Sequence, residues 1–159
     1  MRQRTVRLAD FHRLPGTTPH IESVLDAGEI ITAINIPASR AARHSCYVKV
    51  RDRASFEFAV VSCAAALDMD RDRIREARVA VGGVGTKPWR LPRVETALRG
   101  IRIRMDAQSL RRAAAVATQG AKGYGHNDFK IGLARRAIVR TLGQAARGTP
   151  QSLSDKKIR

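Results

Sequence analysis

Residues 45–62 read SCYVKVRDRASFEFAVVS, and they decide how the rest of the chain folds. The first six residues alternate between two kinds of side chain, which is typical of a half-buried β-strand with Lys49 on its outer side. A polar corner follows at 52–55. The apolar run over 56–67 predicts a second strand, buried on both faces. This order is typical of a loop that contacts a ligand, and equally of a hairpin with basic residues on its solvated face.

The composition is that of one globular domain with a strong positive charge. The chain has 159 residues, enough for a core, and its 43% apolar and 4% aromatic content means that Ala, Val, Ile and Leu must form that core. Lys and Arg number 30 against 14 Asp and Glu, which gives a net charge of +16. Such a charge indicates an acidic partner, a nucleic acid or an acidic neighbouring subunit, without specifying a mechanism.

Several classes of protein are disfavoured by what the sequence contains. Cys46 and Cys63 form no CxxC pair and have no histidine at ligand spacing, so we expect no zinc or iron–sulfur site built from this chain. Both are expected to be small buried residues, and a disulfide across adjacent strands stays open. No catalytic Ser/His/Asp, Cys/His or carboxylate pattern is recognisable. The start lacks the apolar core of a signal peptide and no run is long enough to span a membrane, so we predict a soluble, cytoplasmic protein.

Three more segments have the character of strands or tight turns. Residues 30–36, IITAINI, alternate and predict a strand that ends at Pro37. Residues 74–84 predict a strand that pairs with the preceding one through a loop of about four to six residues. The glycine-rich residues 82–85 permit close approach of a ligand or another chain. Their spacing matches neither phosphate-binding pattern, GxxxxGK[ST] or GxGxxG, so a strand end with a tight turn is the other interpretation.

The second half of the chain is predicted to be helical. Residues 91–99 form a helix that Gly100 ends, residues 107–119 a second helix capped by Asp106, and residues 128–146 the longest helix, capped by Asn127 and Asp128. Strands followed by helices indicate an α+β fold: a small antiparallel sheet of three or four strands packed on about three C-terminal helices. We expect an irregular N-terminal connection over 1–20, the domain over 21–147 and a disordered basic tail over 148–159.

Four segments occur in a characteristic order: GEIITAINIP, YVKVRDRASFEFAVVSCAAAL, IREARVAVGGVGTKPWR and NDFKIGLARRAIVRTL. Together they resemble the C-terminal domain of the flavin (medium) subunit of molybdenum hydroxylases, the family of xanthine dehydrogenase, aldehyde oxidoreductase and carbon monoxide dehydrogenase. The resemblance covers about residues 8–147. It implies the CO dehydrogenase flavoprotein C-terminal fold, a small antiparallel sheet with a helical layer.

The resemblance also implies a place in a larger complex. In the family, electrons leave the substrate at a molybdenum cofactor in a large subunit, pass through [2Fe–2S] clusters in a small subunit and reach FAD in the medium subunit. The family's glycine-rich FAD domain has no counterpart in this sequence. The resemblance therefore implies an oxidoreductase subunit that is not catalytic alone, and that shares FAD with a domain on a separate or missing segment.

The resemblance further implies which residues approach the flavin. In the family, the strand and corner that match residues 47–57 lie beside the isoalloxazine ring. The matching lysine is Lys49, which would stabilise the anionic reduced form by Coulomb attraction, and the acidic residue is Glu57. Arg51, Arg53 and Ser55 are further candidates, as donors to the ring edge or as partners of Glu57. For the two arginines, a surface ion pair with a neighbouring carboxylate is the other interpretation.

The second functional hypothesis is a stand-alone basic module that binds nucleic acid or an acidic protein. Its basic residues lack the interleaved aromatic side chains of single-strand binders, and the sequence has no recognisable helix-turn-helix or zinc finger. We therefore rank nucleic-acid binding below the flavin subunit.

Overall fold

The computed structural model describes residues 3–54, 56–103 and 107–149. The chain divides into two compact units, Met1–Pro37 and Ala38–Arg159. The first unit contains one short helix, α1 (Leu8–Phe11). It is braced by Arg4, whose guanidinium lies 2.5 Å from the Glu29 carboxylate and also donates to the Val24 carbonyl. The hydrogen bond from Arg4 lowers the pKa of Glu29 to about 2.

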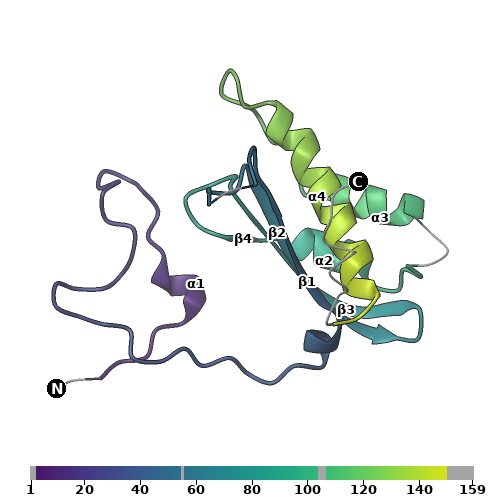
Figure 1. The fold of residues 1–159 in the computed structure, drawn as a ribbon, viewed down its shortest axis with the longest axis horizontal. Helices are drawn as coiled ribbons and strands as arrows, with labels where there is room; N and C mark the ends of the chain where they lie inside the picture. Colours follow the sequence, from purple (N-terminus) through teal and green to yellow (C-terminus); the bar gives the residue numbers. More distant parts are fainter. Residues whose placement is uncertain (1–2, 55, 104–106, 150–159) are drawn as a thin grey trace. The chain divides into compact units, whose positions relative to one another are not determined.

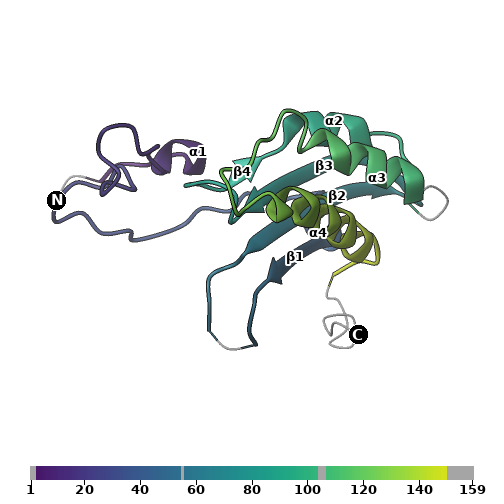
Figure 2. The same ribbon diagram turned by 90° about the horizontal axis from the view of Figure 1, so that it is seen from above.

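The second unit is a four-stranded antiparallel sheet with helices on one face (Figures 1 and 2). The strand order follows the chain: β1 (Ser45–Val50), β2 (Val61–Asp70), β3 (Arg73–Gly82) and β4 (Trp89–Arg90). A 3-10 helix, η1 (Arg40–His44), precedes the sheet, and three helices follow it: α2 (Pro92–Leu98), α3 (Ala107–Val116) and α4 (Phe129–Ala146). The predicted α+β fold is confirmed.

The core lies between the sheet and the helices, and small or branched side chains fill it. Along β2, Cys63, Ala65 and Leu67 are buried, and they meet Ile138 and Leu142 of α4 in one cluster. The residues between them on β2 face the other side, where Ala64 is exposed. The prediction of a strand buried on both faces is therefore wrong, because the helices cover only one face and β2 follows the two-residue alternation of a half-buried strand.

The hairpin between β2 and β3 is confirmed, but its turn is tighter than predicted. Only Arg71 and Asp72 lie between the strands, and Arg71 adopts a positive φ of 55°. The polar residues expected in a longer loop instead extend the ladder, since Asp70 pairs with Arg73. A register shift between Asp68 and Met69 interrupts that ladder. Polar side chains can remain in the strands here because this end of the hairpin is solvated.

Residues 30–36 do not form the predicted strand. Ile30, Ile34 and Ile36 are 81%, 79% and 86% exposed. Within the part of the chain that the structure describes, no backbone hydrogen bond joins 30–36 to another segment. The alternation and β-branched side chains suit a strand, but a strand is stable only when it is paired, and among the described residues this segment has no pairing partner.

The bounds of the helices agree closely with those predicted from the sequence, whereas the predicted capping residues agree less well. α2 and α4 begin and end within one residue of the predicted bounds, whereas α3 ends at Val116 rather than at 119. The predicted cap Asp106 lies outside the described residues. Asn127 does not cap α4: its Oδ1 accepts the Tyr124 N–H at 2.6 Å, and Asp128 makes no capping hydrogen bond. No helix in the described ranges is long and apolar enough to cross a membrane.

Candidate functional site: the corner between β1 and β2 and the outer face of the sheet

The corner that joins β1 to β2, residues 51–60, is closed by an arginine and a glutamate. The Arg53 N–H donates to Glu57 Oε2 at 3.2 Å, and Arg53 Nε lies 3.9 Å from Glu57 Oε1. The same guanidinium donates to the Phe56 carbonyl at 3.1 Å. At the base of the corner, the Val60 N–H donates to the Val50 carbonyl at 2.9 Å and extends the ladder beyond the strands.

This folding of the corner turns two phenylalanines toward solvent. The side chains of Phe56 and Phe58 are 96% and 94% exposed, although the apolar run had predicted a buried strand here. Residues 56–60 lie outside both strands, so that prediction is wrong. Between the two rings, the Glu57 carboxylate turns back toward Arg53, and the phenylalanines on either side of it stay in solvent. The acidic residue between two phenylalanines is the sequence signal that could have revealed this.

The outer face of the sheet is the face opposite α2, α3 and α4. In register across the strands, Lys49 lies beside Ser62, and Ser62 lies beside Gly82. The rest of the centre of this face is also made of small side chains, and longer side chains frame it. The small residues are Ser62, Ala64, Ala66, Ala80 and Gly82, and the framing residues are Tyr47, Lys49, Arg78 and Arg90.

Lys49 therefore stands at the edge of a shelf of small residues. A Cβ on Gly82 would lie 2.6 Å from Ser62 Oγ, so a larger residue there would require the buried Ser62 side chain to move. No bulky side chain stands beside Lys49 on the neighbouring strand. A cation beside such a shelf can meet the edge of a planar ring that lies on the outer face.

The candidate site residues from the sequence have different positions in the structure. Arg53 and Glu57 lie together at the tip of the corner, in the ion pair that the sequence left open. Lys49 is exposed on the outer face, and no hydrogen bond or ion pair among the described residues joins it to Arg53 or Glu57. Arg51 is exposed, and Ser55 lies outside the described residues. A contact of these residues with a flavin stays a prediction.

The glycines at the end of β3 are explained by packing within the chain. Gly83 has a positive φ of 73°, and a Cβ there would lie 2.8 Å from the carbonyl oxygens of Ala59 and Val60. Lys130 Nζ donates to the Gly83 carbonyl at 3.1 Å. A Cβ on Gly85 would lie 3.0 Å from the Trp89 ring. The loop is thus the strand end with a tight turn, and it supports the base of the corner.

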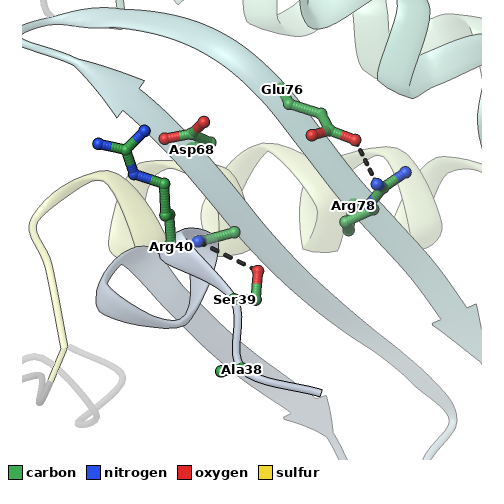
Figure 3. Close-up of a pocket in the computed structure, with 7 residues that line it drawn as sticks. Ala38, Ser39, Arg40, Asp68, Glu76 and Arg78 are labelled. Atoms are coloured by element: carbon green, nitrogen blue, oxygen red, sulfur yellow. Dashed lines mark hydrogen bonds and ion pairs between the residues drawn. The ribbon is translucent and has the colours of Figure 1, made fainter. Parts of the chain in front are cut away.

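A pocket of about 250 Å³ lies at the other end of the outer face, between the chain before β1 and strands β2 and β3 (Figure 3). Three of its four charged residues are paired: Arg78 with Glu76, and Asp68 with Arg75 at 4.0 Å. The fourth is Arg40, and Ser39 Oγ accepts the Ala41 N–H at 3.3 Å. One arginine on an open surface does not indicate a particular ligand for the pocket.

Comparison with known proteins identifies the family. The family model of the CO dehydrogenase flavoprotein C-terminal domain matches residues 46–145, which run from the second residue of β1 to the next-to-last residue of α4. The chain belongs to this family. Within this flavoprotein domain, the corner and the outer face of the sheet lie in the matched region.

The chain is similar to subunits of known oxidoreductases. It is 42% identical over 145 residues to the aldehyde oxidoreductase FAD-binding subunit PaoB of Escherichia coli strain K12, covering 89% of this chain and 41% of that subunit. It is 32% identical over 103 residues to the glyceraldehyde dehydrogenase medium chain of Sulfolobus acidocaldarius, covering 65% of this chain and 34% of that one. The chain thus spans about two fifths or less of the length of these relatives.

Solved structures share the fold of the flavoprotein domain. Quinoline 2-oxidoreductase from Pseudomonas putida 86 superposes with a TM-score of 0.59 at 28% identity, covering 67% of this chain and 38% of that one. CO dehydrogenase from Oligotropha carboxidovorans superposes with a TM-score of 0.71 at 20% identity, covering 87% and 47%. The second likeness is evidence for the fold alone.

The two cysteines lie under α4 and are free thiols, Cys63 buried and Cys46 half-buried. Burial raises the pKa of Cys63 to about 11, against a smaller lowering by the Thr141 hydroxyl. About a thousandth of this thiol is then ionised at pH 8, and the thiolate is the reactive form.

We expect Cys63 in a Cys46→Ser variant to react with Ellman's reagent only after unfolding. Rapid, complete labelling of the folded variant would show that the thiol is accessible.

Proposed function

We propose that this chain is the C-terminal part of the FAD-binding subunit of a molybdenum-dependent aldehyde or xanthine dehydrogenase complex, in which it helps to place the flavin. The observation that carries the proposal is the 42% identity, over 89% of the chain, with a subunit whose name records FAD binding. In the proposed complex, the flavin accepts electrons that arrive from [2Fe–2S] clusters in a small subunit and from a molybdenum cofactor in a large subunit.

The residues of this chain are suited to contact the edge of FAD, but not to bind the whole cofactor. Lys49 offers an exposed ammonium beside the small side chains of the shelf, where the proposal places the edge of the flavin ring. The chain lacks a glycine-rich segment of the kind that binds a pyrophosphate. The rest of the cofactor therefore needs a second polypeptide segment, and FAD is shared in this proposal.

Each residue of the corner has a part in the proposed site. Bound FAD would act as the acceptor of an electron pair. Lys49 would place a positive charge where negative charge develops on the ring, and Arg51 and Ser55 are proposed as further donors. The Arg53–Glu57 pair would hold the corner in shape. Phe56 and Phe58 would be covered by the segment that bears FAD and would keep water from the ring, because two such exposed rings are costly in water.

Co-expression with the molybdenum-binding subunit, the iron–sulfur subunit and a segment that bears FAD tests the proposal. We expect a yellow complex that contains this chain and loses its colour on addition of an aldehyde or a purine. A Phe56→Ser/Phe58→Ser variant should lose the flavin-bearing segment during purification. Tyr124→Ser is the matched control, since Tyr124 is also exposed but belongs to the loop before α4.

Two results would contradict the proposal. The first is a chain that purifies without these subunits and shifts nucleic acid in a salt-sensitive manner, as the stand-alone basic module would. The second is a double phenylalanine variant that retains the flavin-bearing segment as fully as Tyr124→Ser does. The first outcome rejects the complex, and the second rejects only the corner as its contact.

A further inference from the structure

The helical layer of the second unit is strongly and unequally charged. Residues 107–149 contain eight Lys and Arg residues and a single acid, Asp128. The rest of the described chain differs, because the ion pairs found among the described residues all join side chains that precede residue 103. The basic residues of α3 and α4 thus have no carboxylate partner in the described part of the chain.

The charge is concentrated on the solvent side of α4. Gly132, Arg136, Arg140 and Gly143 follow one another at spacings of three and four residues, so they share one face of the helix. We call these four residues the arginine face. The face lies opposite the buried stripe of α4 that contains Ile138. Arg136 and Arg140 are both exposed, and as like charges at i and i+4 they destabilise an isolated helix.

The two glycines of the arginine face have no explanation within the described chain. A Cβ on Gly143 would meet nothing within 4 Å, and a Cβ on Gly132 would only approach the flexible end of Arg136 at 3.5 Å. Glycine weakens the interior of a helix relative to alanine. The face therefore breaks two local rules of helix stability at once, which is expected where another molecule binds. A missing Cβ admits a second backbone close to the helix.

We propose that the arginine face docks an acidic surface of a second protein chain. Gly132 and Gly143 admit the backbone of that chain, and Arg136 and Arg140 bind its carboxylates through paired N–H donors. A protein suits the face better than a nucleic acid, since the arginines are flanked by glycines and not by aromatic side chains on which bases could stack. The site goes beyond the proposed flavin contact. α4 covers the inner side of the sheet (Figure 2), whereas the residues of the shelf lie on the outer side.

Fluorescence anisotropy of the full chain tests the proposal with two labelled probes, a polyglutamate peptide and a single-stranded oligodeoxynucleotide of equal charge. We expect the peptide to bind the wild type, and Arg136→Glu/Arg140→Glu to weaken that binding about tenfold or more. The matched control is Arg71→Glu/Arg73→Glu, which changes the net charge equally at the tip of the β2–β3 hairpin. Circular dichroism verifies that each variant is folded.

The outcomes separate this proposal from its alternatives. Equal weakening by both double variants would mean that bulk charge alone binds the peptide. Tighter binding of the oligonucleotide would assign the face to nucleic acid, and no binding of the peptide would remove the site. No outcome depends on flavin, so failure here leaves the proposed function standing.

A second variant tests the part of the argument that rests on glycine. Gly143→Ala is expected to raise the Tm of the chain by about 2–4 °C, because alanine favours the helix and nothing in the described chain stands in its way. A lower Tm would show that Gly143 serves the fold itself, and would overturn its assignment to a partner.

Discussion

Replacement of Gly83 by alanine is expected to lower the free energy of unfolding by about 2–4 kcal/mol. Two effects add at this position. The backbone has a φ of +73°, which a residue with a Cβ rarely adopts, and the new Cβ would lie 2.8 Å from the carbonyl oxygens of Ala59 and Val60. Backbone atoms cannot swing aside as a flexible side chain does, so the end of β3 or the base of the corner must move.

Urea unfolding, followed by the fluorescence of Trp89, measures this loss, since Trp89 is the only tryptophan of the chain. Gly100→Ala is the matched control: its φ is +85°, but a Cβ there would meet nothing within 4 Å. The control should lose only about 1 kcal/mol, the backbone term alone. Equal losses for the two variants would mean that the Ala59 and Val60 carbonyls yield without cost.

Replacement of Lys49 by methionine is expected to lower the midpoint reduction potential of the flavin in the assembled complex by about 40–80 mV. A unit charge some 4–6 Å from the ring, at an effective dielectric constant of about 20, is worth about 3–4 kcal/mol at most. For a two-electron couple, 30 mV corresponds to about 1.4 kcal/mol. The ammonium favours the state in which the ring has gained negative charge, so its removal shifts the potential downward.

A redox titration against dyes of known potential measures the shift in the purified complex. Lys49→Arg keeps the charge and should keep most of the potential. Lys122→Met removes one charge from the loop between α3 and α4, away from the corner, and should leave the potential unchanged. If Lys49→Met has the potential and acceptor turnover of the wild type, Lys49 does not belong to the flavin site.

Local patterns were sufficient to predict the helices and the order of the strands. α4 could be located because its apolar positions recur at three and four residues and end near Gly148. The β2–β3 hairpin followed from two apolar runs with a polar segment between them. The length of its turn could not be predicted, because Arg71 adopts a positive φ. Arginine rarely does so, and the neighbouring residues do not indicate it.

Two apolar segments misled the prediction. At 56–60, the chain forms a corner that Arg53 and Glu57 close, and both phenylalanine rings of the corner lie in solvent. At 30–36, the strand preference is present, but the segment pairs with no strand among the described residues. A periodic pattern indicates which side chains are apolar enough to be buried. It does not indicate whether the surface that buries them belongs to the same chain.

The candidate site was accessible from the sequence only in part. Alternation placed Lys49 on the outer side of β1, as the register of β1 and β2 confirms. The shelf beside it could not be predicted, because it depends on a register that brings Ser62 and Gly82 into one row across the strands. The spacing of the arginine face could be read from the sequence. That its arginines have no carboxylate partner among the described residues could be seen only in the folded chain.

The exposed run at 30–36 has a consequence for the chain in isolation. IITAINI contains no charge and no proline, and it is rich in β-branched residues, a composition that favours cross-β stacking of identical segments. Only the flanking Glu29 and Pro37 act as gatekeepers against such growth. Concentrated chains in which residues 30–36 are unpaired are therefore prone to aggregate through this segment. The solubility of the protein then reports what fraction of the chains has this segment paired.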